Sequence, residues 1–310
     1  MSSALRQMNA FTIDLEDWFQ GLTSTNPLTD KWPFFSSRVV PATESLLDIL
    51  RACQVQATFF VLGYTADQHP MLIQRIQAEG HEIGIHGYSH RYVYQLAPHE
   101  FAQELERSIE AVTSITGEMP LGHRAPYFSF NASTSWAFDI LQAKGFRYDS
   151  SVFPTRSMLY GYPQAPRFPY RLNGHALMEF PLSTLRLAGF NWPIAGGLYL
   201  RTLPYILVRW AILRLNRQGQ PAIMYMHPWE LDLDQHYDRV TPRERITHYH
   251  GRRSLKEKLY RLFADFSFCS LGRLIELQYN SDPSKDEDVS STTRFLEGTD
   301  HESRHRVPST

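Results

Sequence analysis

The chain has 310 residues, enough for one large barrel-sized domain or for two ordinary domains. Hydrophobic residues make up 43% of it and charged residues 20%, so it can bury a sizeable core. Its formal net charge of -1 gives no support to a partner held mainly by long-range electrostatics, such as nucleic acid or an anionic membrane surface.

We expect residues 1–8 to be flexible. They contain no apolar run of signal-peptide length, and no part of the chain reaches the roughly 18 apolar residues of a membrane span, so a cytoplasmic location is expected.

The two cysteines, Cys53 and Cys269, form no CxxC pair, and each lies in a segment with the pattern of an amphipathic helix. We expect both to be small buried side chains, in keeping with a reducing compartment.

Short apolar runs alternate with helical patterns from residue 9 to residue 151. This alternation is typical of β/α units around a mainly parallel sheet. The clearest helix covers residues 98–116, where apolar residues recur at helical spacing before Gly117. In chain order, the patterns predict a strand over Ala10–Asp14, a helix over Pro41–Leu50, a strand over Ala57–Leu62, a helix over Met71–Glu79, a strand over His81–His86, helices over Pro98–Thr116 and Ser135–Lys144, and a strand over Phe146–Tyr148.

The regular alternation weakens after Ser151. Residues 153–198 are rich in proline, glycine and aromatic residues, and they predict loops with short antiparallel strands at Ala176–Phe180 and Leu185–Ala188. A helix over Leu203–Arg217, a strand over Ala222–Met226 and a helix over Leu255–Phe266 are expected next. Residues 279–310 are polar, so we expect a disordered tail behind a single domain that spans residues 9–278.

Three carboxylates follow the first predicted strand. The segment Thr12–Trp18 runs from an apolar strand into Asp14, Glu16 and Asp17. Three acids at a strand end repel one another unless a cation binds there, and the carboxyl ends of strands are where α/β sheets place their ligands. The alternative is that such a cluster is a solvated turn or a helix cap.

A pair of histidines follows the strand over residues 81–86. His86 and His90 are four residues apart, and on a helical turn this spacing puts two imidazoles on one face, as in many zinc sites. Gly87 follows the first histidine, so the motif lacks the glutamate of the zinc-protease helix. Two ordinary surface or capped histidines are the alternative. His81, at the start of the strand, is expected to be structural.

Two further motifs hold polar residues near strand ends. One is Gly122–Tyr127, which contains His123 and Arg124. In the other, Met224–Glu230, an apolar strand leads to His227, and Pro228 ends the ladder. A lone histidine in this position is more often a core residue than a catalytic one.

Together, these motifs resemble those of the NodB-type polysaccharide deacetylases, carbohydrate esterase family 4. The resemblance extends from about Asn9 to Trp229 and follows the family's order: an acidic strand end, HxxxH, RxPY and a late strand that ends in histidine. The segments 14–18, 86–90, 148–151 and 227–230 are most similar to the branch found with bacterial exopolysaccharide clusters, and Gly251–Leu271 is similar to that branch's extra C-terminal segment, here about 233–278. The resemblance implies a distorted β/α barrel with seven strands.

The resemblance also implies a role for each matching residue. Asp14 corresponds to the catalytic base, Arg124 to the residue that orients it, and His227 to the general acid, with His123 as the alternative acid. The backbone N–H of Tyr127 is expected to stabilise the oxyanion. We expect Asp149 to tune a neighbouring group.

His86 and His90 correspond to the family's metal ligands, and the expected cofactor is a divalent metal, zinc being favoured. The third ligand differs from the commonest family motif, which has two adjacent aspartates. Because alternate strand residues share a face, Glu16 is expected on the side of Asp14 and is favoured over Asp17. Gly87 is a second departure, since most members have Ser or Thr there.

The implied activity is deacetylation of N-acetylated sugars in a polysaccharide or oligosaccharide, without nucleic acid or membrane insertion. Two alternatives stay open: an amidohydrolase for a small N-acyl or ureide compound, and a catalytically silent glycan-binding module. Aromatic residues could stack on sugar rings or simply belong to the core, among them Tyr160, Tyr162, Tyr170, Phe190 and Trp192.

Overall fold

The computed structural model describes residues 7–156, 161–172 and 174–279. Residues 1–6 of the expected flexible N-terminus, residues 280–310 of the expected tail and the aromatic Tyr160 lie outside the described residues. Tyr279, which we assigned to the tail, is buried and packs edge-on against Phe180, with ring centroids 5.6 Å apart.

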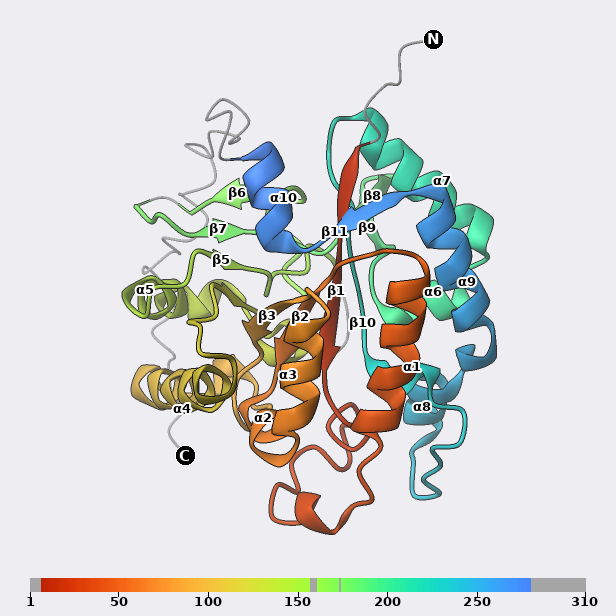
Figure 1. Cartoon of the computed structure of the whole chain (residues 1–310). Coiled ribbons are helices and arrows are strands. Elements are labelled where there is room, and N and C mark those ends of the chain that lie inside the picture. The colour runs from red at the N-terminus through yellow and green to blue at the C-terminus, as the bar shows by residue number, and fades with distance from the viewer. Residues whose placement is uncertain (1–6, 157–160, 173, 280–310) are drawn as a thin grey trace, which may run out of the picture.

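The strands form one curled, mostly parallel sheet (Figure 1). Its order is β10-β1-β2-β3-β4-β5-β7-β6, and β11 also pairs with β1. The seven strands from β10 to β7 pair in parallel, and β6 is antiparallel to β7. The backbone N–H of Ser183, just after β7, donates to the carbonyl of Ile223 at the start of β10 (3.2 Å). This contact joins the two sides of the curled sheet, and the expected distorted barrel is confirmed, with seven strands in parallel within a sheet of nine among the described residues.

The strands are short, apart from β1. In chain order they are β1 (Met8–Leu15), β2 (Thr58–Val61), β3 (Glu82–Ile85), β4 (Gly122–His123), β5 (Tyr148–Asp149), β6 (Tyr170–Arg171), β7 (Met178–Glu179), β8 (Thr184–Leu187), β9 (Phe190–Pro193), β10 (Ile223–Met226) and β11 (Ser267–Cys269). Strands β8 and β9 form a separate antiparallel hairpin.

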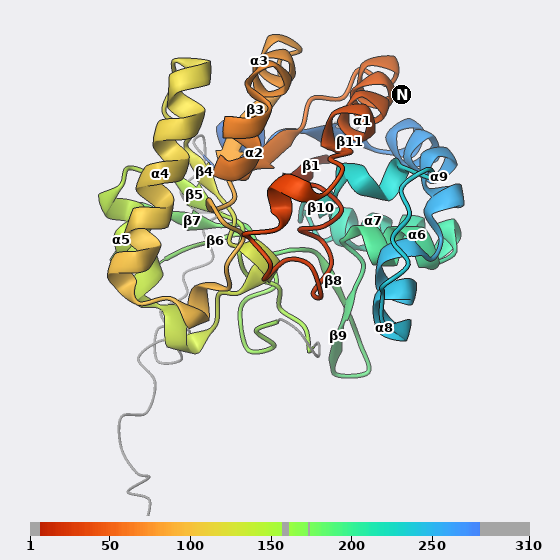
Figure 2. The same cartoon turned by 90° about the horizontal axis from the view of Figure 1, so that it is seen from below.

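Helices cover the sheet on three sides, as the view along the strands shows, and loops and the β8–β9 hairpin lie on the fourth (Figure 2). They are α1 (Val39–Ala52), α2 (Gly63–Gln68), α3 (Pro70–Ala78), α4 (Pro98–Thr116), α5 (Trp136–Ala143), α6 (Gly197–Thr202), α7 (Tyr205–Arg217), α8 (Pro242–Glu244), α9 (Arg252–Asp265) and α10 (Leu271–Gln278). None of the helices within the described ranges is both long and apolar enough to cross a bilayer.

Helix α4 has the bounds expected from the sequence. Its apolar residues Phe101, Leu105 and Val112 are buried, and Gly117 ends it in the left-handed conformation (φ 73°). The Gly117 N–H donates to the carbonyl of Thr113 (2.8 Å), which closes the last turn. Spacing and a terminal glycine together were therefore sufficient to locate this helix.

The expected positions of the two cysteines were wrong in detail. Cys53 is half-buried and directly follows α1 rather than lying inside it. Cys269 is buried, as expected, but it belongs to β11, which pairs in parallel with β1. The apolar run around it fits a buried edge strand as well as a helix, and periodicity cannot separate the two over so short a segment.

The parallel arrangement brings the chemical motifs to one end of the barrel. Strand β1 runs from top to bottom in Figure 1, so Figure 2 looks onto the carboxyl ends of the strands. The segments after β1, β3, β4 and β10 carry Glu16, His86, Arg124 and His227, respectively. Residues far apart in the sequence therefore meet at this end.

Candidate active site

Glu16 and two histidines meet at the carboxyl end of β1. The Oε1 atom of Glu16 lies 3.4 Å from Nε2 of His86 and 3.2 Å from Nε2 of His90. The opposite ring nitrogens are held by oxygens: Nδ1 of His86 lies 2.8 Å from the carbonyl of Arg124, and Nδ1 of His90 lies 2.9 Å from Oδ1 of Asn26. With each Nδ1–H donating to oxygen, both Nε2 lone pairs point toward Glu16.

These three side chains fit a divalent cation. All three are buried, and within the described part of the chain Glu16 Oε2 and the Nε2 atoms of His86 and His90 have no hydrogen-bond partner. Their ligand atoms lie within 4.8 Å of one another. Burial lowers the pKa of His90 more than Glu16 raises it, which keeps the imidazole in the neutral form that binds metal. Two imidazoles and one carboxylate leave coordination positions open, as in catalytic zinc sites.

The two histidines converge through a loop and not through the helical turn that we expected. Gly87 (φ 75°) and His90 (φ 53°) both have left-handed backbone conformations, and the segment after β3 forms no helix before Val93. Glu104 of α4 holds the loop by accepting hydrogen bonds from the N–H groups of Tyr88 (3.2 Å) and Ser89 (2.9 Å). The left-handed conformations of Gly87 and His90 turn the chain back toward β3, and this brings His90 beside His86 despite the absence of a helix.

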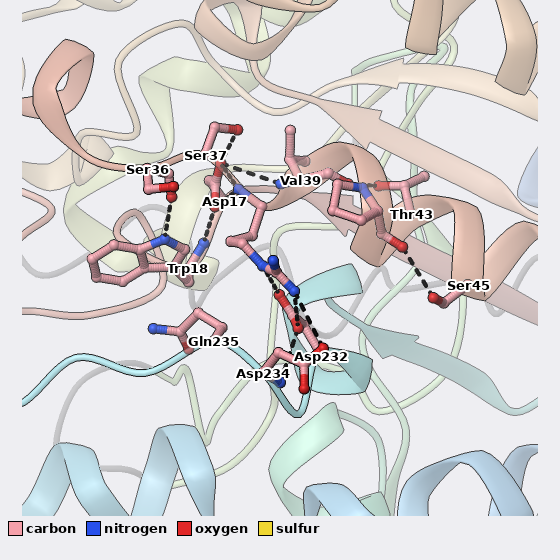
Figure 3. Close-up of polar contacts among 12 residues, drawn as sticks. Asp17, Trp18, Ser36, Ser37, Val39, Thr43, Ser45, Asp232, Asp234 and Gln235 are labelled. Atoms are coloured by element: carbon pink, nitrogen blue, oxygen red, sulfur yellow. Dashed lines mark hydrogen bonds and ion pairs between the residues drawn. The ribbon is translucent and has the colours of Figure 1, made fainter.

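The side chain of Asp17 points toward Ser37 and the start of α1 (Figure 3). Its carboxylate accepts hydrogen bonds from the Ser37 hydroxyl (2.5 Å) and from the N–H groups of Arg38 (3.1 Å) and Val39 (3.3 Å), where α1 begins. Burial raises the pKa of Asp17, although these hydrogen bonds oppose the rise. The helix-cap reading therefore fits Asp17, whereas Glu16 faces the two histidines.

Arg124 holds Asp14 in a fixed position. Its Nη1 donates to Asp14 Oδ1 (2.7 Å) and to Thr12 Oγ1 (2.8 Å), and its Nε and Nη2 bond the carbonyl (3.0 Å) and hydroxyl (2.8 Å) of Ser150. The guanidinium is fully buried, with its central carbon 4.3 Å from the centre of the Phe60 ring. Asp14 and Arg124, which the sequence analysis expected to act together, are in direct contact.

His227 is the third imidazole beside Glu16. Its Nε2 lies 3.3 Å from Glu16 Oε1, and its Nδ1 lies 2.9 Å from Glu230 Oε1. Glu230 in turn accepts a hydrogen bond from Arg201 Nε (2.5 Å). Burial alone would lower the pKa of His227, but the two carboxylates outweigh it and raise that pKa to about 10. Burial would raise the pKa of Glu230, but Arg201 and His227 lower it to about 2.

Three residues that support the site were not predicted from the sequence. Glu230 could have been found, because it follows His227 by three residues in a short 3-10 helix that begins at Pro228. Arg201 of α6 and Asn26 belong to no recognisable motif. Each is far in the sequence from its partner, Glu230 and His90 respectively, so their roles could not be predicted from the sequence.

A cavity at this end of the barrel is lined in part by these groups. Asp14, Glu16 and His227 line it together with Tyr127, whose hydroxyl donates to the carbonyl of Gln20 (3.0 Å). Tyr127 has a left-handed backbone (φ 56°). Part of the wall comes from the C-terminal region, through Trp229, Arg243, Glu244 and Thr247.

His123 and Asp149 form a buried pair that does not line this cavity. Nδ1 of His123 lies 2.7 Å from Asp149 Oδ1, and Ser151 also donates to that oxygen (2.7 Å). Burial lowers the pKa of His123, and its ring packs against Phe101 and other aromatic residues. His81 accepts a hydrogen bond from the backbone N–H of Ala57 (3.2 Å), a structural contact.

Two family models match the chain. Residues 30–148 match the model described as polysaccharide deacetylase, and residues 150–276 match a domain of unknown function, DUF3473. Asp14 and Glu16 precede both matches, whereas His86, His90 and Arg124 fall in the first and His227 in the second.

Curated relatives and a solved structure are similar to this chain. A peptidoglycan deacetylase-like protein of Gibberella zeae is 33% identical over 150 residues, covering 46% of this chain and 43% of that protein. A peptidoglycan-N-acetylglucosamine deacetylase of Listeria monocytogenes is 30% identical over 135 residues, covering 41% and 28%. The chain thus matches less than half the length of each. A Mycobacterium smegmatis structure assigned to the polysaccharide deacetylases shares the fold, with a TM-score of 0.60 and 22% identity over 91% of this chain and 93% of that one.

Proposed function

The chain carries a domain of the polysaccharide deacetylase family with a NodB-type barrel, and on this premise we propose that it is a metal-dependent deacetylase of N-acetylated glycans. The observation that carries the proposal is the convergence of three imidazoles on one carboxylate oxygen. The Nε2 atoms of His86, His90 and His227 lie 3.4, 3.2 and 3.3 Å from Glu16 Oε1. A silent glycan-binding module has no need for such a cluster at the base of its cavity.

Glu16, His86 and His90 would hold the metal ion, and zinc is the ion we favour. When bound, a divalent cation supplies a Lewis acid that polarises the acetyl carbonyl and makes a water molecule more acidic. Glu16 is the proposed third ligand because its buried oxygens face the imidazoles, whereas the oxygens of Asp17 are used by α1.

Asp14 is the proposed general base. It would accept the proton of the attacking water, and Arg124 would keep its carboxylate oriented through the 2.7 Å contact. Negative charge then develops on the former acetyl oxygen, where the backbone N–H of Tyr127 would donate a hydrogen bond. The position of Tyr127 in the cavity wall supports this role.

His227 is the proposed general acid. An amine is a poor leaving group unless it receives a proton, and protonated His227 would donate one to the sugar nitrogen from Nε2. Glu230 accepts from Nδ1, so it fixes the ring with Nε2 toward the cavity. Arg201 positions Glu230 and is itself anchored by the carbonyls of Thr247 (2.8 Å) and His250 (2.5 Å). We propose Arg201 and Glu230 as positioning residues for the acid.

The proposed polymer is a bacterial exopolysaccharide or a related glycan. Its support is the resemblance of the C-terminal segment to the exopolysaccharide branch, together with the part that segment plays in the cavity wall through Arg243 and Thr247. Of the relatives named above, one is named a peptidoglycan-N-acetylglucosamine deacetylase and one a peptidoglycan deacetylase-like protein, and another, from a Pestalotiopsis species, is named a chitin deacetylase. N-acetylglucosamine oligomers are therefore a suitable first substrate.

Acetate release tests this proposal. Purified protein should release acetate from N-acetylglucosamine oligomers, should lose this activity after treatment with a chelator, and should regain it when zinc is restored. A ureide and a small N-acyl amine serve as comparison substrates. Turnover of these small compounds without turnover of the oligomers would mean that the chain is an amidohydrolase of a different substrate class.

A further inference from the structure

One region of the chain has a net positive charge because it is poor in acidic residues. Residues 150–229 contain no lysine and a single acidic residue, Glu179, against eight arginines: Arg156, Arg167, Arg171, Arg186, Arg201, Arg209, Arg214 and Arg217. Glu179 is buried, and burial together with the nearby Asp149 raises its pKa well above the usual value, so it offsets little of this charge. Two of the arginines are paired with carboxylates outside the block, Arg201 with Glu230 and Arg209 with Asp265, so these two are not available to a partner. The net charge of -1 is an average that hides this block.

Helix α7, within this block, has apolar side chains on its outer face as well as its inner face. Val208, Ile212 and other residues of the inner face are buried in the core. On the outer face, Ile206 is 63%, Leu207 49% and Trp210 42% exposed. One helical turn further along, the same face continues with Arg214 and Arg217. An outer stripe of Ile, Leu, Trp and Arg is typical of helices that lie in a membrane interface.

The β8–β9 hairpin, also in this block, carries a second group of exposed apolar side chains. Leu187 is 36%, Phe190 60% and Trp192 57% exposed. Leu187 pairs directly with Phe190, and Trp192 lies two residues further along the same strand, so the three share one face of the hairpin. Tryptophan and phenylalanine at a protruding hairpin can enter the headgroup region of a bilayer, where an aromatic ring meets both apolar chains and water.

Arginines lie at the base of the hairpin, on β8 and on α7. Arg167 donates to the carbonyl (2.6 Å) and hydroxyl (3.2 Å) oxygens of Thr184 at the base of the hairpin. Burial lowers the pKa of Arg167, and the nearby charges of Arg186 on β8 and Arg214 on α7 lower it further. Like charges on β8 and α7, in a block poor in acidic residues, favour an anionic partner.

We propose that the outer face of α7 and the β8–β9 hairpin dock on the surface of an anionic phospholipid bilayer. Apolar and aromatic side chains would enter the interface, and the arginines would lie at the level of the phosphates, where each contributes to attraction toward anionic lipid. Docking of this kind needs no spanning helix. The inference goes beyond the proposed catalytic function and does not depend on it.

Vesicle flotation with the full chain tests the proposal. We expect the protein to float with vesicles of phosphatidylcholine and phosphatidylglycerol, to float much less with phosphatidylcholine alone, and to dissociate as salt is raised. Arg214→Gln and Arg217→Gln should each lower the partition coefficient about fivefold. Two apolar double variants, Ile206→Gln with Trp210→Gln and Phe190→Ser with Trp192→Ser, should each lower it at least about tenfold.

Exposed residues elsewhere supply matched controls. Met71→Gln on α3, where Met71 is 75% exposed, and Arg273→Gln on α10 should leave the partition coefficient unchanged. Thermal midpoints measured on every variant check that the fold is intact. Failure of the wild-type protein to float with anionic vesicles would overturn the proposal, as would flotation of the apolar double variants at the wild-type level. Sedimentation that shows a dimer lost in the Trp210 variant would assign the face to a second copy of the chain instead.

Discussion

Glu16 is the side chain on which the site depends, and its surroundings explain why. A buried carboxylate is costly unless cations or hydrogen-bond donors compensate it. Burial would raise the pKa of Glu16, but His90 and His227 outweigh this effect and hold the pKa well below its usual value. One oxygen of Glu16 still has no hydrogen-bond partner within the described residues. The carboxylate is therefore ionised and incompletely compensated, which suits a cation site.

The metal ligands can be tested one at a time. His86→Ala and His90→Ala should each remove bound metal and activity without unfolding the protein, because three protein ligands leave none to spare. Glu16→Ala should weaken metal binding far more than Asp17→Ala. Metal content after dialysis is the measurement, and His236→Ala, at an exposed surface position, is the matched control. Full metal occupancy in the His86/His90 double variant would rule out this ligand set.

The role of His227 can be separated from simple binding by the choice of leaving group. His227→Ala should slow the hydrolysis of N-acetyl sugars by about 100- to 10,000-fold, because the amine leaves only when protonated. Acetate esters of phenols, whose leaving groups depart without a proton, should be affected much less. Initial rates on both substrates are compared. Equal slowing on both substrates would make His227 a binding or structural residue.

Asp17 caps the start of helix α1, although its position in the sequence made it a candidate metal ligand. A carboxylate at the start of a helix satisfies free N–H groups and interacts favourably with the helix dipole. Asp17→Ala should therefore destabilise the fold by about 1–2 kcal/mol through α1 while leaving metal affinity nearly unchanged. Asp17→Asn, which keeps an acceptor, should lose less. Denaturant unfolding measures the effect, and a larger loss of metal affinity in Asp17→Ala than in Glu16→Ala would reverse the assignment.

Elements with a strong local signal could be predicted from the sequence, and those formed by distant contacts could not. Helix α4 and the strands β1, β2, β3 and β10 have clear periodicity or continuous apolar runs. Strands β4 (Gly122–His123) and β6 (Tyr170–Arg171) have two residues each and exist only because neighbouring strands pair with them. The loop that returns His90 toward β3 depends on Glu104 of α4, a contact without any sequence signature.

The site residues, like the elements, could be predicted where the sequence carries a local signal. Asp14, Glu16, His86, Arg124 and His227 stand at or just beyond strand ends, and parallel strands bring such positions together. Their convergence at one cavity could therefore be expected. The choice between Glu16 and Asp17 depended on the direction of each side chain beyond the end of β1. The alternation of side chains along a strand predicts these directions only while the strand continues.

At the scale of the whole molecule, both matched regions contribute to one barrel and one cavity. Strands β2, β3 and β4 lie in residues 30–148, and β7 and β10 lie in residues 150–276. The central strand β1 precedes both regions and pairs with β2 on one side and β10 on the other. Neither region alone would close the sheet, since each would expose unpaired strand edges.

The C-terminal boundary of the barrel can be tested by truncation. Residues 280–310 are rich in polar residues and have few apolar ones, so ending the chain after Tyr279 should leave the thermal midpoint and turnover almost unchanged. Ending it after Gln278 should lower the midpoint, because it removes the Tyr279 ring that packs against Phe180. Calorimetry on both truncated proteins gives the comparison. A drop of several degrees in the longer one would mean that residues 280–310 stabilise the barrel.

The most direct test of the proposed site is acetate release by Asp14→Asn at matched metal content and thermal midpoint. Asparagine keeps the size of the side chain but cannot accept the proton of water, so the rate on N-acetylglucosamine oligomers should fall at least about 100-fold at every pH. Wild-type protein measured in parallel should release acetate steadily. Turnover by Asp14→Asn within about tenfold of the wild-type rate would contradict the assignment of Asp14 as the base and, with it, the proposed mechanism.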